Sequence, residues 1–322
     1  MIKIKNLIIL YPSYERGGAT INLINFVNTC ALKDIKIHLI SNIKKKDKKN
    51  FVKKNIKFIN LNDKFDYKIL SRSITSIASI FLLLDLFKSI DSKNSLVVSF
   101  QSHILPIIFS RLFRRKIVIR NSENIIEATK YADYKFSASV IFLLKLFFYN
   151  FSNGIITNSN KAKKSLDVIT FKNKTKLIFN PYLKKVFSKN TAKRENLILS
   201  VGRLCKQKNQ SIAILAFANF LKKFPNYKLV LIGHGDDELK LKKLCLELNI
   251  SKNVIFKGWL PNLKKYYLKS KILIFPSLYE GLPNTLIEAV NFNLPCISSR
   301  CSGASDILTE RYGTFIPRYN DV

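Results

Sequence analysis

The sequence predicts an α/β protein of two domains, each built on a parallel β-sheet. The chain has 322 residues, 47% of them hydrophobic, which is enough for two separate cores. Short apolar strands alternate with helical patterns along the chain, as in βαβ units. The alternation breaks at Asn180-Pro181-Tyr182 and in the polar stretch Phe187–Arg194, because proline disfavours helix at the residue before it. We therefore expect domains at residues 1–182 and 183–322.

In the first domain, apolar strands alternate with long helical patterns. Strands are expected at Asn6–Leu10, Ile35–Ile40, Ile56–Leu61, Leu96–Phe100, Ile117–Arg120 and Gly154–Asn158. Helices are expected at Ala19–Leu32, Ile69–Ile90, Ile104–Phe113 and Ala138–Phe151. The lysine-rich segment Lys44–Lys54 interrupts the pattern, and we interpret it as a solvated loop.

The second domain repeats the same alternation. Its strands are expected at Leu197–Val201, Leu229–Ile232, Val254–Phe256, Ile272–Phe275 and Cys296–Ser298. Its helices are expected at Gln210–Phe224, Asp237–Leu248, Leu263–Lys269 and Asn284–Asn291.

The net charge of +34 favours an anionic partner, such as nucleic acid, an acidic membrane surface or a phosphorylated substrate. Over-use of scattered, solvent-facing lysines is the alternative. The aromatic residues lie mostly in apolar runs, so we expect no nucleic-acid partner. No apolar run reaches the roughly eighteen residues that a membrane-spanning helix needs. The five cysteines form no Cys-x-x-Cys pair, which favours a reduced cytoplasmic protein without structural zinc.

Glycines and cations follow the first strand of each domain. Gly17 and Gly18 precede the first helix, where backbone N–H groups attract phosphate, although a tight strand-to-helix connection explains them equally well. Gly202 is followed by Arg203 and Lys208 at the carboxyl end of a strand, the edge at which α/β sheets bind ligands. A guanidinium and an ammonium group can together neutralise a diphosphate.

A carboxylate pair flanks a helix start in the segment Pro276–Ala289. Pro283 suits the beginning of a helix, whose positive end attracts anions. Glu280 and Glu288 lie on either side of this anion site, and a carboxylate beside phosphate is repelled unless it binds hydroxyls. Sugar hydroxyls are therefore the expected targets. A surface Glu and an early-helix Glu that complements the helix dipole are the structural alternative.

Together these motifs resemble the group 1 glycosyltransferases, the large retaining family also called family 4. Glu280-x7-Glu288 is similar to the family's E-x7-E signature, and Val-Gly202-Arg203-Leu-x-x-x-Lys208 to its diphosphate loop. The stretch from Leu294 to Ala304 looks like its G-x-P-V-V…G-G segment, with Ala304 replacing the second glycine. The resemblance covers nearly the whole chain, which also looks like the bacterial members that build surface polysaccharides and lipid-linked oligosaccharides.

The resemblance implies a GT-B fold, with two facing Rossmann-like domains. It implies that Arg203 and Lys208 hold the donor diphosphate, that Glu288 binds the ribose, and that Glu280 binds the transferred sugar. Arg203, Lys208 and Glu280 are therefore the expected catalytic residues. The expected donor-binding residues are Gly17, Gly18, Gly202, Arg203, Lys208, Gly233, Trp259, Leu260, Glu280, Gly281, Leu282, Pro283, Asn284, Thr285 and Glu288. Neither a metal nor a cofactor is expected, because cations and a helix N-terminus stabilise the leaving group.

The implied activity is retaining transfer of a hexose or N-acetylhexosamine from a nucleotide sugar to a lipid-linked or polysaccharide acceptor. A UDP-linked donor is favoured. A nucleotide-sugar epimerase or hydrolase on the same fold is the alternative, and a basic nucleic-acid-binding protein is less favoured. His103 is the candidate for the histidine that many relatives place near the sugar, although a helix-start histidine can also be structural. Relatives continue beyond the position of Val322, so we expect the second domain to be incomplete at its end.

The first domain is expected to meet an anionic membrane surface as a peripheral protein on the cytoplasmic side. Lys44–Lys54 holds seven lysines in eleven positions. A second basic cluster consists of Arg111, Arg114, Arg115 and Lys116. The apolar segment Ser137–Phe151 is too short to span a bilayer and is interrupted by Lys145, but it can lie in the interface. An ordinary buried helix is the alternative for this segment.

Overall fold

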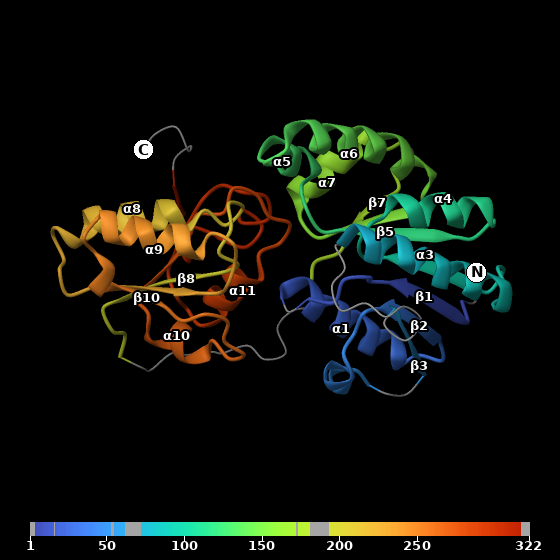
Figure 1. Ribbon diagram of the computed structural model, residues 1–322, viewed down its shortest axis with the longest axis horizontal. Coiled ribbons are helices and arrows are strands. Elements are labelled where there is room, and N and C mark those ends of the chain that lie inside the picture. Colours follow the sequence, from blue (N-terminus) through green and yellow to red (C-terminus); the bar gives the residue numbers. More distant parts are fainter. Residues whose placement is uncertain are drawn as a thin grey trace. The chain divides into compact units, whose positions relative to one another are not determined.

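The computed structural model describes residues 4–15, 17–52, 55–61, 72–171, 173–180 and 193–316. These residues form two α/β units, each with its own parallel sheet (Figure 1). The first unit takes in residues 1–125, 134–158 and 163–182, and the second takes in 126–133, 159–162 and 183–322. The second unit therefore includes two short segments that the sequence places before the expected linker. Most of that linker lies outside the described residues.

The first sheet is seven-stranded, with every pair of neighbours parallel, in the order β3-β2-β1-β4-β5-β6-β7. Its strands are β1 (Asn6–Leu10), β2 (Lys36–Ser41), β3 (Ile56–Asn60), β4 (Ser95–Ser99), β5 (Ile117–Asn121), β6 (Gly154–Thr157) and β7 (Thr175–Leu177). Its helices are α1 (Gly18–Ala31), α3 (Arg72–Ser89), α4 (Ile104–Leu112), α5 (Ile125–Lys130), α6 (Lys135–Phe148) and α7 (Asn160–Ile169), with short 3₁₀ turns η1 (Lys45–Asn50) and η2 (Tyr149–Phe151). The strand order reverses direction between β1 and β4, where α/β sheets bind ligands beyond their carboxyl ends.

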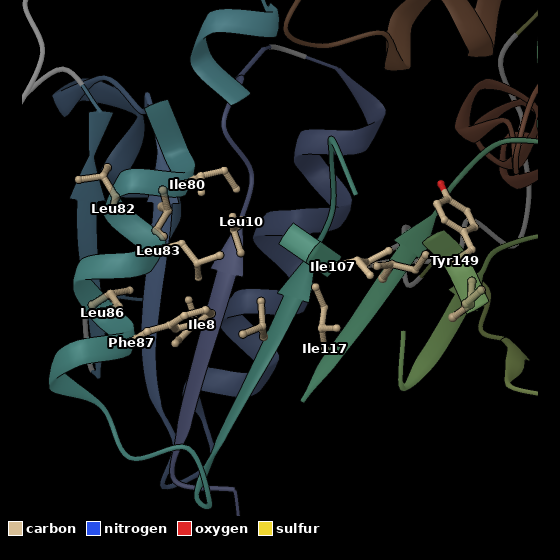
Figure 2. Close-up of a cluster of buried hydrophobic side chains, with 14 of the residues drawn as sticks. Ile8, Leu10, Ile80, Leu82, Leu83, Leu86, Phe87, Ile107, Ile117 and Tyr149 are labelled. Carbon is tan, nitrogen blue, oxygen red and sulfur yellow. The ribbon is translucent and has the colours of Figure 1, made fainter. Parts of the chain in front are cut away.

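Helices cover both faces of this sheet because its central strands are apolar on both sides. Ile8 and Leu10 of β1 pack in one core with α3, and Figure 2 shows Leu83 of that helix beside them. The alternate residues Leu7 and Ile9 pack in a second core with α1. A strand sends successive side chains to opposite faces, so one continuous apolar run supports both layers.

The second sheet is six-stranded, again parallel throughout, in the order β10-β9-β8-β11-β12-β13. Its strands are β8 (Leu197–Val201), β9 (Lys228–Ile232), β10 (Val254–Phe256), β11 (Ile272–Phe275), β12 (Cys296–Ser298) and β13 (Gly313–Phe315). Its helices are α8 (Gln210–Leu221), α9 (Glu238–Glu247), α10 (Lys264–Lys269) and α11 (Asn284–Asn291), with a 3₁₀ turn η3 (Ser251–Asn253). Helices α8 and α9 pack with one core cluster, and α10 and α11 with the other (Figure 1). This is the Rossmann strand order, with its switch point between β8 and β11.

In the part of the chain that the structure describes, the expected strands and helices are confirmed to within a few residues, and residues 69–71 of the expected helix Ile69–Ile90 lie outside that part. The structure adds four elements. Helices α5 and α7 and strands β7 and β13 were not expected. Strands β7 and β13 have three residues each, and α7 carries several charges on its exposed side, so none of these elements gives a strong apolar pattern. The expected loop Lys44–Lys54 instead contains η1, followed by Phe51, which is buried in the core beside α1.

One expectation about the first domain is wrong, and another is met only in part. Arg115 does not belong to an exposed basic cluster, because it is buried and donates hydrogen bonds to the carbonyl oxygens of Phe87 and Ile90, near the end of α3. The segment Ser137–Phe151 is partly buried: Tyr149 lies in the core and Phe142 and Leu146 of α6 pack against it, whereas other apolar residues of α6 are exposed. No helix in the described part of the chain is both long and apolar enough to cross a membrane.

Candidate active site

The loops at the carboxyl edge of the second sheet are held together by close approaches at glycine. The N–H of Gly202 donates to the carbonyl of Ile232 (3.0 Å), and a Cβ at Gly233 would lie 1.9 Å from the Gly202 oxygen. A Cβ at Gly303 would lie 1.8 Å from the Gly281 oxygen. Gly233 and Gly303 also have φ values of +146° and +77°, which other residues adopt only under strain. The loops after β8, β9, β11 and β12 therefore form one packed rim.

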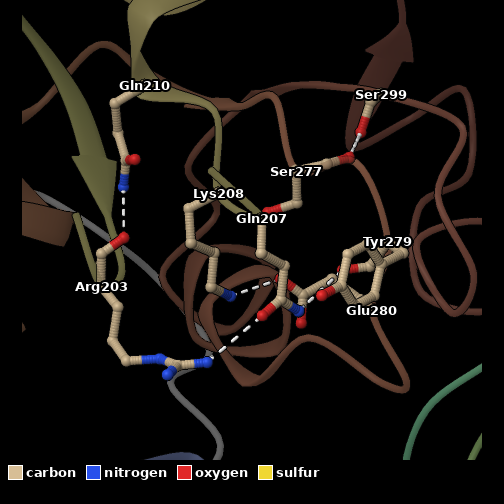
Figure 3. A network of polar contacts seen from close by, with 8 residues as sticks. All are labelled: Arg203, Gln207, Lys208, Gln210, Ser277, Tyr279, Glu280 and Ser299. Atoms are coloured by element: carbon tan, nitrogen blue, oxygen red, sulfur yellow. Dashed lines mark hydrogen bonds and ion pairs between the residues drawn. The ribbon is translucent and has the colours of Figure 1, made fainter. Parts of the chain in front are cut away.

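Gln207 joins the loop after β8 to the loop after β11. The side-chain amide of Gln207 donates to the backbone carbonyl of Tyr279 (2.9 Å). The backbone carbonyl of Gln207 accepts a hydrogen bond from the N–H of Leu278 (2.8 Å). The guanidinium of Arg203 donates to the Gln207 Oε1 (3.2 Å), and the Arg203 carbonyl accepts from Gln210 (2.8 Å) (Figure 3). Arg203 is exposed to solvent. Its charged end is therefore placed at the switch point between β8 and β11 and remains accessible.

Lys208 and Glu280 form an ion pair at the same place. The Lys208 Nζ donates to the Glu280 Oε1, and Figure 3 shows the two side chains pointing toward one another. Their side chains are only 17% and 12% exposed. The Nζ also lies 5.4 Å from the centre of the Phe275 ring. The sequence predicted the two residues separately, and the structure brings them together across 72 positions of chain.

The expected anion site at the start of α11 has the predicted local form. Pro283 precedes the helix in an extended conformation, and its carbonyl accepts from the N–H of Leu286 (3.1 Å). The N–H groups of Asn284 and Thr285 thus belong to the first turn, before the intrahelical bonds begin. Helix α11 starts directly after the loop that carries Glu280, so the carboxylate lies next to the positive end of the helix.

Glu288 is fixed by a residue that sequence analysis missed. The hydroxyl of Tyr267 donates to the Glu288 Oε2 (2.5 Å), which links α10 to α11. Tyr267 is fully buried and stacks on Phe292, with ring centres 5.6 Å apart. The partly buried Glu288 is therefore oriented by a rigid tyrosine. Tyr267 follows Tyr266 in a lysine-rich helix, and this local sequence gives no signal of the contact with Glu288.

The turns after β9 and β10 also meet. A Cβ at Gly258 would lie 2.8 Å from the His234 ring, so the two loops approach closely. Trp259 is exposed, whereas Leu260 is half-buried and packs against the core of the second domain. In the described residues, no group of three or more His, Cys, Asp or Glu side chains forms a metal-binding cluster.

Gly17, Gly18 and His103 lie in the first unit. Gly17 precedes α1, and a Cβ built on it would meet nothing within 4 Å. The side-chain amide of Gln101 exchanges hydrogen bonds with the backbone of Ser13 (3.0 and 3.2 Å), which ties the loop after β4 to the loop after β1. His103 starts α4, and its Nδ1 lies 3.0 Å from the Ser99 hydroxyl. Burial, followed by the charges of Lys145 and Arg120, lowers the pKa of His103 to about 3.

Residues 183–322 match the family described as glycosyl transferases group 1. Over the whole chain, the fold is similar to that of TarM (TM-score 0.78, 14% identity, covering 99% of this chain and 90% of TarM). It is also similar to the fold of HepE from Anabaena in complex with UDP and glucose (TM-score 0.72, 16% identity, covering 97% of this chain and 85% of HepE). The likeness to these solved structures shows a GT-B fold, and the match to the group 1 family covers the second domain.

The chain is also similar over part of its length to proteins named as glycosyltransferases. An uncharacterised glycosyltransferase of Methanocaldococcus jannaschii is 34% identical over 225 residues, 64% of this chain and 54% of its own length. A Campylobacter jejuni N-acetyl-D-galactosaminyltransferase, named for an undecaprenol-linked saccharide, is 34% identical over 146 residues, 44% of this chain and 40% of its own length. The chain thus spans about half the length of the curated relatives it matches.

Proposed function

We propose that this glycosyltransferase moves a hexose or N-acetylhexosamine from a UDP-sugar to a lipid-linked saccharide, with retention of the anomeric configuration. The observation that carries the proposal is the group of Arg203, Lys208 and Glu280 at the β8–β11 switch point. Two cations suit a diphosphate and a carboxylate suits sugar hydroxyls, and in this group the three side chains share one sheet edge. The UDP bound to HepE supports the choice of nucleotide.

Charge stabilisation of the leaving group explains how the reaction proceeds. The bond between the anomeric carbon and the diphosphate oxygen breaks, and the acceptor oxygen bonds to that carbon on the same face. The acceptor proton passes to the departing diphosphate. Arg203 and the first turn of α11 stabilise the negative charge that develops there, so the reaction needs neither a metal nor a cofactor.

Lys208 and Glu280 bind each other in the absence of the donor and bind the donor when it is present. With no ligand, each charge satisfies the other in a largely buried place. Once the donor is bound, the three donors of the ammonium group can serve both the carboxylate and a phosphate oxygen. Glu280 then accepts hydrogen bonds from hydroxyls of the transferred sugar, and Glu288, oriented by Tyr267, accepts them from the ribose.

The activity is tested by incubating the protein with a panel of UDP-hexoses and UDP-N-acetylhexosamines in EDTA, with and without a prenyl diphosphate-linked saccharide. We expect a product only when the acceptor is present, and its anomeric proton coupling should match that of the donor. An inverted product contradicts retention. Conversion of the donor into an isomer without acceptor would instead indicate an epimerase.

The acceptor is proposed to reach the protein at the cytoplasmic face of an anionic membrane. The undecaprenol-linked saccharide in the name of the Campylobacter relative supports this, and so does the surface of α6. Phe136, Leu143 and Phe147 follow one face of that helix and are 84%, 62% and 60% exposed. The adjoining face, with Phe142 and Leu146, packs on the core. Apolar side chains in such a stripe can enter the lipid interface.

Basic side chains in the first domain add an electrostatic attraction. Lys45, Lys46 and Lys49 of η1 are exposed, as are Arg111 and Arg114 at the end of α4. Each basic residue close to an anionic leaflet contributes about 1 kcal/mol, and salt screens this attraction. Arg115 is excluded from the basic surface because it is buried.

A further inference from the structure

Arg120 places a partly buried cation at the carboxyl end of β5, in the first domain. Its guanidinium carbon lies 5.2 Å from the centre of the Phe100 ring. One terminal nitrogen donates to the hydroxyl of Ser122 (2.6 Å), and the other donates to the amide oxygen of Asn180 (2.5 Å). Both acceptors are neutral. The local hydrogen bonds therefore orient the guanidinium without neutralising it.

No carboxylate of the described residues forms an ion pair with Arg120. The nearby carboxylate of Glu123 is instead 3.0 Å from the Nζ of Lys145. Burial lowers the pKa of Arg120 to about 10, which shows that the charge is held where water solvates it poorly. Such a charge is costly unless it is paired, and structures usually keep it only where a ligand provides the counter-charge.

The imidazole of His103 is a second polar group close to Arg120. The Ser99 hydroxyl donates its hydrogen to the carbonyl of Gln101 (2.8 Å), so it accepts a hydrogen bond from the Nδ1–H of His103 (3.0 Å). His103 is thus neutral, with the lone pair on Nε2. The positive charge of Arg120 is close enough to lower the pKa of His103. A cation and a hydrogen-bond acceptor together suit a ligand that has both an anionic group and a hydroxyl.

We propose that Arg120 binds an anionic phosphate oxygen of the acceptor, and that His103 Nε2 accepts a hydrogen bond from a hydroxyl of the same molecule. The inference rests on the proposed function and assigns a phosphate- or diphosphate-bearing saccharide as the acceptor. Each terminal nitrogen carries a second N–H group that can donate to a phosphate oxygen, and such a contact is charge-assisted. The cation–π contact with Phe100 and the two hydrogen bonds keep the guanidinium in one orientation.

The first test is calorimetric titration with inorganic diphosphate, using protein that has been saturated with UDP so that the donor site is occupied. Arg120→Gln should weaken diphosphate binding about tenfold or more, because a charge-assisted hydrogen bond contributes roughly 1.5–3 kcal/mol. Arg111→Gln, which removes an exposed arginine from the same domain, is the matched control and should bind as the wild type does. Equal affinity in Arg120→Gln and Arg111→Gln overturns the proposal.

The same titration without UDP separates this inference from the proposed function. If UDP does not bind, the donor assignment fails, yet loss of diphosphate binding in Arg120→Gln still supports the anion site. A soluble short-chain prenyl diphosphate saccharide forms the second arm. Tighter binding of this ligand than of inorganic diphosphate, lost in Arg120→Gln, identifies the acceptor rather than free phosphate as the ligand. Equal binding of the two in that arm contradicts the assignment of the acceptor.

Ring nitrogen signals of His103 and the melting temperature distinguish a binding role from a structural one. The chain has only three histidines, so the imidazole spectrum is simple to assign. Diphosphate should shift the His103 signals in the wild type and leave them unmoved in Arg120→Gln.

Because Arg120 has no carboxylate partner among the described residues, the melting temperature of Arg120→Gln should be close to that of the wild type. A melting temperature several degrees lower, with unchanged diphosphate affinity, would make Arg120 structural. Arg120→Lys, which keeps the charge but loses the fork, gives an intermediate affinity if Arg120→Gln does not fold.

Discussion

The ion pair of Lys208 and Glu280 joins two charges that the sequence assigns to different parts of the donor. Both side chains are mostly buried, so each depends on the other for its stability in the folded protein. Loss of either partner therefore destabilises the fold, in addition to its effect on the proposed chemistry. Removal of one charge should cost more than removal of both.

A double-mutant cycle tests this dependence. Lys208→Met should lower the free energy of unfolding by on the order of 3 kcal/mol, because it leaves the Glu280 carboxylate without its cation. Lys208→Met combined with Glu280→Gln should recover a large part of that loss. Urea unfolding measures all three variants. Additive losses in the double variant would mean that the two groups do not interact.

The protonation of His103 makes a second residue-scale prediction. Its pKa lies at about 3 in the folded protein and at 6.5 when unperturbed, so between these values only the unfolded chain binds the proton. As the pH falls from 6.5 towards 3, the free energy of unfolding therefore decreases by at most about 1.4 kcal/mol per pH unit. Above pH 6.5, His103 has no such effect on stability. His103→Gln should lose less stability than the wild type between pH 6.5 and 4, as measured by denaturant unfolding. Parallel pH profiles would contradict the buried, neutral imidazole.

At the scale of elements, the rim of the second sheet depends on contacts that only glycine allows. Gly233→Ala would place a methyl group 1.9 Å from the Gly202 oxygen, which forces the loops after β8 and β9 apart. We expect a loss of stability of roughly 2 kcal/mol or more together with weaker UDP binding. Gly154→Ala is the control, since its Cβ would meet only ordinary contacts at 3.6 and 3.9 Å. Similar melting temperatures and similar UDP affinities for the two variants would disprove the account of the rim.

The exposed face of α6 gives a second element-scale prediction. Replacing Phe136, Leu143 and Phe147 by Ser should reduce flotation with anionic liposomes, and high salt should reduce it further. The matched control replaces Leu239 and Leu246 of α9, which are 81% and 66% exposed in the second domain. This control should float as the wild type does. A wild type that ignores anionic liposomes at low salt contradicts the membrane proposal.

At the scale of the molecule, the sequence predicts the repeated α/β alternation well because buried parallel strands are continuous apolar runs. It also predicts where Gly202, Arg203 and Pro283 stand, since strand ends and helix starts leave local signals. The partners of those residues are set by tertiary contacts instead. The Lys208–Glu280 pair, the Tyr267 hydroxyl on Glu288 and the burial of Arg115 each join positions far apart in the chain. No local pattern distinguishes the buried Arg115 from its exposed neighbour Arg114.

The central claim is that the second domain binds a nucleotide diphosphate through cations and a helix N-terminus, without metal. Calorimetric titration with UDP in EDTA tests it most directly, on the wild type, on Arg203→Ala and on the exposed-arginine control Arg311→Ala. We predict that the wild type and the control bind UDP in EDTA, and that Arg203→Ala binds about tenfold more weakly or worse, since a charge-assisted phosphate contact contributes roughly 1.5–3 kcal/mol. Unchanged affinity in Arg203→Ala, or binding that appears only when magnesium is added, would contradict the account.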